Sequence, residues 1–424
     1  MLGKFTTFDR WSTLLAACLL AIGCGVPPET DHAGLEYQVR QITQGPKHHF
    51  FGYIGHVQNI PWNGNERYVV ALRVDFVDRF PNADDTAEIV LLDVANDYSV
   101  RQVESTRAWN PQQGTMLYWN PDSPDTQFFF NDRDPETNKV FCVLYDIEQG
   151  RRIREYRSEE TPVGNGGVAQ NGGHFLGLNY GRMARLRRVT GYADAYDWTV
   201  GVPHPDDDGL FKTNVETGEQ ELIVSFKQMR DALIERHPQI ETTPLFLNHS
   251  LWNRDGDRIY FFVRGNFGSR ETRVNVPMTV RPDGSELTEQ RVFIGGHPEW
   301  ELGPRMIGRV GPDLVLYDSE RQVIVEKIGT PEIFTLPEGD LALSPDAKWI
   351  TQGHPDRPLT SFVVFRRSDG AWLRTEGLDQ TGYTRGDLRI DPAPKWNRSS
   401  NQVIFPSLAD DAGRTRQMFL LTVK

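Results

Sequence analysis

Cysteine is scarce in this sequence, and so are long hydrophobic runs. Only three cysteines occur in 424 residues, at Cys18, Cys24 and Cys142. Cys142 alone lies in the body of the chain, where its surroundings VFCVLYD predict a strand. A single cysteine excludes an internal disulfide and favours a buried, inert thiol. The apolar run over residues 14–22 is too short to span a membrane.

An excess of positive charge is also missing. The chain has 46 Lys and Arg residues against 58 Asp and Glu residues, a formal net charge of −12, and no basic tail or stripe. This balance argues against a nucleic-acid partner and against binding to an anionic membrane surface. Several catalytic patterns are absent too: there is no GxSxG, no HExxH, no phosphate-binding loop and no CxxC pair.

The N-terminus has the pattern of an export signal. Lys4 and Arg10 precede the apolar run, which ends in LAIGC at Cys24. This ending resembles the lipobox of bacterial lipoproteins, in which the cysteine is lipidated and becomes the new N-terminus. An ordinary secretory signal cleaved nearby is the alternative. We expect a signal peptide over residues 1–24, a linker over 25–35, and a periplasmic or outer-membrane-attached lipoprotein that meets the membrane only through its lipid anchor.

The sequence does contain a repeated motif, in which an aromatic or apolar residue is followed by a polar turn and an apolar strand. Such repeats every 40–50 residues or so are typical of propeller blades. Paired strands with Gly, Asp, Asn or Ser turns follow most copies, and residues 227–236 form the best of few helix candidates. The seven copies begin at Trp62, Trp119, Ala169, Trp252, Trp300, Leu343 and Trp396.

These copies predict an all-β fold, a single propeller of about seven four-stranded blades over residues 36–424. The last blade, which ends in QMFLLTVK, lacks a fourth strand, whereas residues 36–43 (EYQVRQIT) belong to no blade. Pairing the two would close the ring and remove an exposed sheet edge. An insertion over residues 182–208 interrupts the third blade and is expected to form a loop or small lid. We expect a monomer.

Aligning the copies identifies candidate channel residues, because the innermost strand of each blade runs along the central axis. Three residues before each landmark stand Asn59, Met116, Gly166, His249, His297, Asp340 and Ala393. Asp391 lies in the segment before the last landmark. Two imidazoles and two carboxylates from adjacent blades could hold a divalent metal, or form a base and its partner. Alternatively, these groups bond only to neighbouring blades or to channel water.

Other polar residues are candidates for ligand contacts. His48 and His49 are adjacent on a predicted strand, so they point to opposite faces and at most one reaches a given site. Gln113 belongs to the segment RAWNPQQGTML of the second blade. Arg182 and Arg185 open the insertion, where arginines over a channel mouth would suit carboxylate recognition. The alternative is that they balance the aspartates of the same insertion.

The order of these segments resembles the TolB-like and oligogalacturonate-lyase-like propellers of bacteria. The resemblance covers most of the chain after the signal, and it rests on the turn repeat and on HHFFGY, RAWNPQQGTML, LNHSLWNRDGDRIYF, GGHPEW and DPAPKWNRSSNQVIF. Oligogalacturonate lyases cleave short uronides by β-elimination, with a histidine base, an arginine that neutralises the substrate carboxylate, and a histidine-rich manganese site.

The resemblance implies roles for particular residues. His249 matches the base, Arg182 approximately matches the arginine, and His297 matches one metal-ligand histidine. Asp340 and Asp391 could assist His297 in a manganese site, but the closing strand carries Ala393 and Leu388 where the lyases have ligands. The sequence therefore favours an exported propeller that binds a ligand or protein at its channel mouth, either an acidic oligosaccharide or an envelope protein. A lyase acting on acidic oligosaccharides is the alternative.

Overall fold

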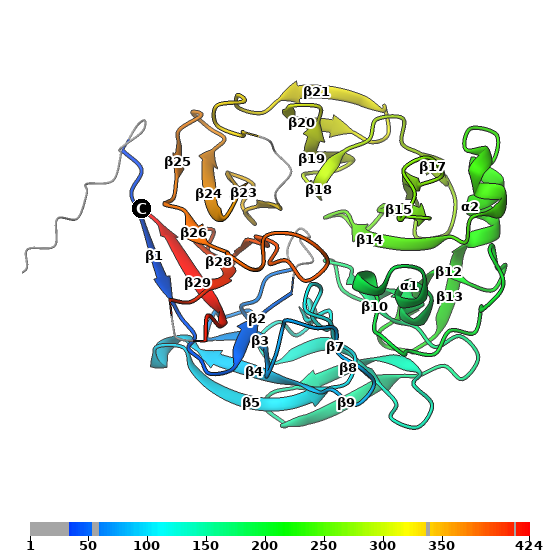
Figure 1. The fold of residues 1–424 in the computed structure, drawn as a ribbon, viewed down its shortest axis with the longest axis horizontal. Helices are drawn as coiled ribbons and strands as arrows, with labels where there is room; N and C mark the ends of the chain where they lie inside the picture. The colour runs from blue at the N-terminus through cyan, green and yellow to red at the C-terminus, as the bar shows by residue number, and fades with distance from the viewer. Residues whose placement is uncertain (1–33, 53–58, 336–339, 411–412) are drawn as a thin grey trace, which may run out of the picture.

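Seven antiparallel sheets are arranged in a ring around a central axis (Figure 1). This computed structural model describes residues 34–52, 59–335, 340–410 and 413–424. The predicted seven-bladed β-propeller is confirmed. The signal peptide, Cys24 and residues 25–33 of the expected linker lie outside the described residues.

The strands of each blade follow one another in the chain, from the innermost outward. The first four blades are β2 (His48–Phe50), β3 (Tyr68–Val74), β4 (Ala87–Asp93) and β5 (Ser99–Thr106); β6 (Tyr118–Trp119), β7 (Gln127–Arg133), β8 (Val140–Asp146) and β9 (Arg151–Tyr156); β10 (Gly164–Val168), β11 (His174–Leu178), β12 (Gly209–Asn214) and β13 (Gln220–Ser225); and β14 (Phe246–Trp252), β15 (Ile259–Gly265), β16 (Val274–Val280) and β17 (Thr288–Glu289).

The remaining blades follow the same plan with two additions. They are β18 (Gly295–Trp300), β19 (Arg305–Val310), β20 (Asp313–Asp318) and β21 (Val323–Lys327); β22 (Leu341–Leu343), β23 (Trp349–Asp356), β24 (Leu359–Arg366) and β25 (Trp372–Arg374), where β26 (Leu378–Asp379) also pairs with β24; and β27 (Lys395–Trp396), β28 (Gln402–Leu408) and β29 (Arg416–Val423), which β1 (Tyr37–Gln41) completes.

The repeated tryptophans join neighbouring blades. The indole nitrogen of Trp300 donates to the carbonyl oxygen of Leu251 in the preceding blade at 2.9 Å, and that of Trp396 donates to Ala342 at 3.1 Å. Trp119 and Trp252 make the equivalent bonds. Because each of these four tryptophans buries a large ring and satisfies its one donor across an interface, tryptophan recurs where these blades meet.

The predicted ring closure is confirmed. β1 pairs antiparallel with β29, in a register that runs from Tyr37 opposite Val423 to Gln41 opposite Phe419. The N-terminal strand thus supplies the outer strand of the last blade, and the edge of β29 is covered. The expected burial of Cys142 on β8 is confirmed as well, and burial raises the pKa of its thiol well above the ordinary value.

Helices lie only in the connections. The described ones are η1 (Val94–Asn96), α1 (Tyr180–Leu186), η2 (Arg188–Thr190), α2 (Phe226–Leu233) and η3 (Pro238–Thr242). α1 and η2 belong to the insertion between β11 and β12, and α2 falls where the sequence favoured a helix. Within the described ranges, none of the helices has the length and apolar character needed to cross a membrane.

Candidate ligand site at the channel mouth

The inner strands share a bulge at the position that the repeat alignment singled out. His249 and His297 both have a positive φ, at 56° and 57°, and the register of β14 and β18 shifts at these points. Met116 and Ala393, at the same position in other blades, have φ values of 58° and 40°. A positive φ in a residue other than glycine is a mild strain. Its recurrence at methionine and alanine shows that it belongs to the blade architecture rather than to histidine chemistry.

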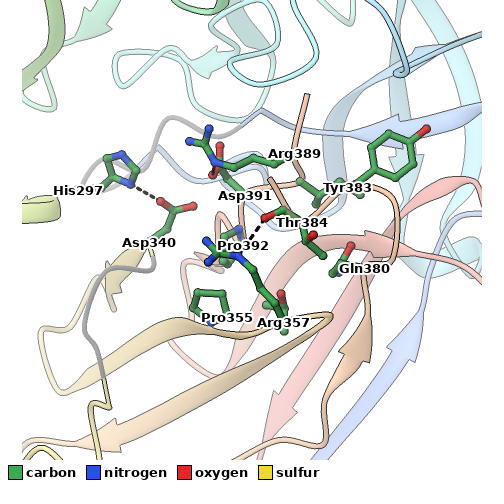
Figure 2. Close-up of a pocket in the computed structure, with 12 residues that line it drawn as sticks. His297, Asp340, Pro355, Arg357, Gln380, Tyr383, Thr384, Arg389, Asp391 and Pro392 are labelled. Carbon is green, nitrogen blue, oxygen red and sulfur yellow. Dashed lines mark hydrogen bonds and ion pairs between the residues drawn. The ribbon is translucent and has the colours of Figure 1, made fainter. Parts of the chain in front are cut away.

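Four of the predicted residues meet near the axis. The ring centroids of His249 and His297 lie 5.0 Å apart. The Nδ1 atom of His297 and an oxygen of Asp340 share a hydrogen bond, and the other oxygen of Asp340 accepts the backbone N–H of Ala393 at 2.8 Å. Asp391 lines the same cavity as His297 and Asp340 (Figure 2). The three residues that the alignment of repeats identified on neighbouring blades, His249, His297 and Asp340, therefore lie together, and Asp391 lies beside them.

A pocket opens beside this cluster, and a loop that joins the sixth and seventh blades forms much of its wall. In Figure 1 this loop, the orange-red segment after β26, lies over the centre of the ring. The pocket encloses about 210 Å³. Its lining residues are His297, Asp340, Pro355, Arg357, Thr360, Gln380, Tyr383, Thr384, Arg389, Ile390, Asp391 and Pro392.

The loop, which we call the mouth loop (residues 380–394), is seated on blade six. The backbone N–H of Gln380 donates to the carbonyl oxygen of Pro358, and that of Ile390 donates to Tyr383 within the loop, each at 2.9 Å. Pro392 packs so closely on Gly353 of β23 that a Cβ there would lie 2.0 Å from the proline ring. Position 353 therefore requires glycine, and the loop is held by packing as well as by hydrogen bonds.

Two buried acceptors in the pocket wall have no hydrogen-bond partner in the described structure. These are Oδ2 of Asp391 and Oε1 of Gln380, in side chains that are 6% and 3% exposed. The other polar atoms of these groups are used: Oδ1 of Asp391 accepts from Arg389 at 2.8 Å, and Nε2 of Gln380 donates to Ser407 at 2.8 Å. An unmade hydrogen bond at a buried acceptor is costly. Both atoms thus suit a ligand that brings donors.

Arginines surround the Asp391 carboxylate. Burial and the neighbouring Asp340 raise the pKa of Asp391, whereas Arg389 and His297 act in the opposite direction. Arg416 of β29 is buried, its guanidinium lies 4.4 Å from the ring of Phe50, and burial lowers its pKa to about 10 although the charge of Asp391 opposes this. These cations already balance the carboxylate, so a cationic ligand would gain little there.

Arg357 is the exposed cation of the pocket. It lies between β23 and β24, and its Nε donates to the carbonyl oxygen of Thr384 in the mouth loop at 3.1 Å. Figure 2 shows its side chain reaching toward Thr384 and Pro392. In the described structure its two terminal nitrogens make no hydrogen bond or ion pair. They are placed to receive a carboxylate in bidentate fashion.

The structure places Arg182 elsewhere. Its side chain is 0% exposed at the start of α1, and its guanidinium donates to the carbonyl oxygens of Leu245 (2.5 Å), Val202 (3.1 Å) and Pro203 (2.6 Å) and to Oγ1 of Thr199 (2.7 Å). These bonds tie the insertion to itself and to the fourth blade. Because its donors are engaged and enclosed, Arg182 does not reach the mouth pocket as the expected clamp would.

Arg185 has the alternative role that the sequence left open, which is to balance an aspartate of the same insertion. Its Nε donates to Asp197 at 2.7 Å, which is a balancing pair within the insertion. Arg185 is not among the residues that line the mouth pocket.

The remaining candidates lie around the axis but outside the pocket. Nδ1 of His49 lies 2.9 Å from Oε1 of Gln417, and burial lowers the pKa of His49 to about 4. His48 accepts the backbone N–H of Arg416 at 2.9 Å. Gln113 and His249 line a separate cavity of about 10 Å³, with room for one water molecule at most. Of these two cavities, His249 lines the small one and not the mouth pocket.

The residues do not fit the manganese site that the resemblance implies. Across residues 34–52, 59–335, 340–410 and 413–424, no three His, Cys, Asp or Glu side chains are arranged to hold a metal ion. Within the predicted set, Nδ1 of His297 bonds to Asp340, and one oxygen of Asp391 bonds to Arg389. A divalent ion needs several donors directed at one point.

Fold and site together define a seven-bladed propeller with a polar pocket at its channel mouth. No family model matches the chain, and no curated protein matches it either.

Solved structures match at the level of the fold. The β-propeller domain of Cps50 (Swd1) from Myceliophteria thermophila is 11% identical, with 89% of this chain and 100% of that chain covered and a TM-score of 0.46. TolB from Acinetobacter baumannii is 11% identical over 92% and 97% of the two chains, with a TM-score of 0.39. A putative TolB from Agrobacterium tumefaciens is 12% identical over 81% and 89%, with a TM-score of 0.38.

Proposed function

We propose that this protein is an exported binding propeller that holds a small hydroxylated acid, such as the end of an acidic oligosaccharide, in the pocket at its channel mouth. The observation that carries the proposal is the pair of buried, unpartnered acceptors, Oδ2 of Asp391 and Oε1 of Gln380, in the wall of one cavity. Hydroxyl donors satisfy them without adding charge. The terminal nitrogens of Arg357 receive the acid group.

The size of the pocket limits the ligand. A volume of about 210 Å³ is below the roughly 300–1,000 Å³ of pockets that enclose drug-sized molecules. The pocket therefore suits one small unit, or the terminal unit of a longer chain. Export rests on the signal-like N-terminus and is part of the proposal.

Binding is favoured over β-elimination by the position of His249. A base must lie within hydrogen-bond reach of the proton that it removes. His249 borders the cavity of about 10 Å³ rather than the mouth pocket, and its ring packs edge-on against Phe262 at 5.8 Å. Arg182, the other expected catalytic group, is enclosed by backbone carbonyls. A lyase reaction would lack both its base and its carboxylate clamp at the pocket.

Calorimetric titration with a saturated uronide dimer tests the proposal. Two further probes dissect the ligand: a neutral sugar dimer lacks the acid group, and succinate lacks hydroxyl groups. We expect the uronide to bind more tightly than either. Gln380→Met should weaken uronide binding about three- to ten-fold, because it removes one acceptor. Gln290→Met is the matched control, since Gln290 is also buried and donates to a hydroxyl, that of Thr279, on the fourth blade.

Two outcomes would contradict the proposal. One is uronide affinity equal in the protein and in Gln380→Met. The other is formation of an unsaturated product, followed by its ultraviolet absorbance with and without added manganese, that His249→Ala abolishes in a folded protein. The second result would establish the lyase.

A further inference from the structure

We infer that two copies of this protein associate through β21 (Val323–Lys327), the outermost strand of the fifth blade, by antiparallel strand pairing. The inference does not depend on the proposed function, because β21 lies at the outer rim of the ring (Figure 1) and the ligand pocket lies at the channel mouth. In place of the monomer that the sequence led us to expect, it predicts a weak dimer that forms at high protein concentration.

One edge of β21 is open to pairing with another strand. β21 pairs antiparallel with β20 on its inner side, and it ends the strand order of the fifth blade. In the ranges that the structure describes, no strand pairs with its outer side. Such an edge presents a row of backbone N–H and C=O groups, which are a template for a strand of another chain.

Three consecutive apolar side chains of this edge strand are exposed. Val323, Ile324 and Val325 are 40%, 44% and 47% exposed. Proteins commonly protect an open edge with charged side chains along the strand. The outer strands of the first two blades do so, with Arg101 in the first half of β5 and Arg154 in the second half of β9, whereas β21 is charged only at its end. This edge is therefore unusually apolar for the fold, which favours association.

The position of Val325 is covered in three other blades. In each of β5, β9, β13 and β21, the register with the preceding strand shifts at one extra residue, and these residues are Val103, Ile153, Ile223 and Val325. Ile223 is buried, and Val103 and Ile153 pack partly buried against the hydrophobic core. Val325 is the exposed member of the four. On the fifth blade the chain itself does not cover this apolar residue, so a partner can.

The partner that fits best is a second copy, because the segment is complementary to its own antiparallel copy. Residues 321–326, which are β21 and the turn before it, read RQVIVE, with opposite charges at the two ends. When two copies pair about a two-fold axis between Val323 and Ile324, these two residues lie opposite each other. Arg321 of each copy then lies opposite Glu326 of the other, and opposite charges across a strand pair are stabilising.

Both charges are available for such a pairing. The side chains of Arg321 and Glu326 are exposed, and in the described part of the chain neither forms an ion pair. One added strand pair is a small interface, well below the roughly 1,200–2,000 Å² that stable complexes bury. We therefore expect a dissociation constant on the order of 0.1 mM rather than a permanent dimer.

Sedimentation velocity at increasing protein concentration tests the inference. We expect a dimer to appear as the concentration approaches about 0.1 mM. Ile324→Lys should weaken the dimer at least about ten-fold, because it places like charges at the centre of the pairing. Val100→Lys is the matched control, since Val100 is also an exposed apolar residue on an outer strand, β5, and this variant should dimerise as the unmodified protein does.

Charge reversal tests the two-fold arrangement itself. Arg321→Glu and Glu326→Arg each place like charges opposite one another, so each variant alone should dimerise about three- to ten-fold more weakly. An equal mixture of the two variants restores opposite charges at both ends and should recover the dimer. A protein that stays monomeric at 1 mM overturns the inference. So does a dimer that Ile324→Lys leaves intact, or one that the mixture of reversed variants fails to recover.

Discussion

Replacing Arg182 with methionine tests whether this residue is structural or functional. The guanidinium donates four hydrogen bonds inside the protein, three to backbone carbonyls and one to Thr199, and its side chain is 0% exposed. Leaving a buried acceptor without its donor typically costs about 1–3 kcal/mol, so losing these bonds should cost about 3–5 kcal/mol even if some acceptors find new partners. The unfolding entropy is about 2.1 cal/mol/K per residue, so in a chain of this size each kcal/mol lowers Tm by about 1 °C. We therefore expect Arg182→Met to lower Tm by about 3–6 °C.

Thermal unfolding followed by circular dichroism provides the measurement, and Arg185→Met is the control. Arg185 starts from the same helix but is exposed, and its one pair with Asp197 contributes less than about 1 kcal/mol. Its variant should melt within about 1 °C of the unmodified protein. Below its melting transition, Arg182→Met should bind the mouth ligand normally. A Tm unchanged by Arg182→Met, together with lost uronide binding, would refute the structural account.

Two further predictions concern acid stability and the N-terminus. The pKa of His49 is lowered to about 4 by burial, so between pH 6.5 and 4 the unfolded chain takes up a proton that the native state does not. The contribution of neutral His49 to the free energy of unfolding is complete above pH 6.5 and falls by about 3 kcal/mol as the pH is lowered toward 4. In urea unfolding across this range, the free energy of unfolding should fall less steeply with decreasing pH for His49→Gln than for the unmodified protein. The same pH dependence in both proteins would contradict the lowered pKa of His49. Cys24→Ala should release the protein from the membrane fraction; retention there would exclude the lipid anchor.

The blades could be predicted because their sequence signal has a local physical cause. Four of the landmark tryptophans bury their rings and satisfy their indole N–H groups at an interface between blades, as Trp300 and Trp396 do. The asparagine that follows organises the turn: Oδ1 of Asn253 accepts the backbone N–H groups of Asp257 and Arg258, each at 3.0 Å. The same physics sets the spacing that brought His249, His297 and Asp340 together.

The mouth loop could not be predicted in this way. Residues 380–394 follow no repeat, and their course depends on contacts with distant residues, such as that of Pro392 with Gly353. The sequence did carry a signal in the Tyr, Arg and Asp residues of QTGYTRGDLRID, which is unusually polar for a connection between blades. Only Asp391 of this segment was identified as a candidate. Gln380, Arg357 and Arg389 were missed, because their relevance appears only when the loop is folded over the pocket.

In the insertion, the sequence indicated a pocket residue that the structure places elsewhere. Arg182 was assigned to the mouth because it begins an arginine-rich segment, but Asn179 caps α1 by accepting the backbone N–H of Arg182, and the arginine side chain is buried beneath the insertion. The repeat sets no register inside an insertion. A side chain's direction there follows from helix geometry and local packing, which the spacing of residues in the sequence does not determine.

A crystal structure of the protein with a bound uronide dimer tests the central claim most directly. The account predicts ligand hydroxyl groups within hydrogen-bond distance of Oδ2 of Asp391 and Oε1 of Gln380, with the carboxylate on the terminal nitrogens of Arg357. A uronide bound against His249 and away from the mouth loop would contradict it.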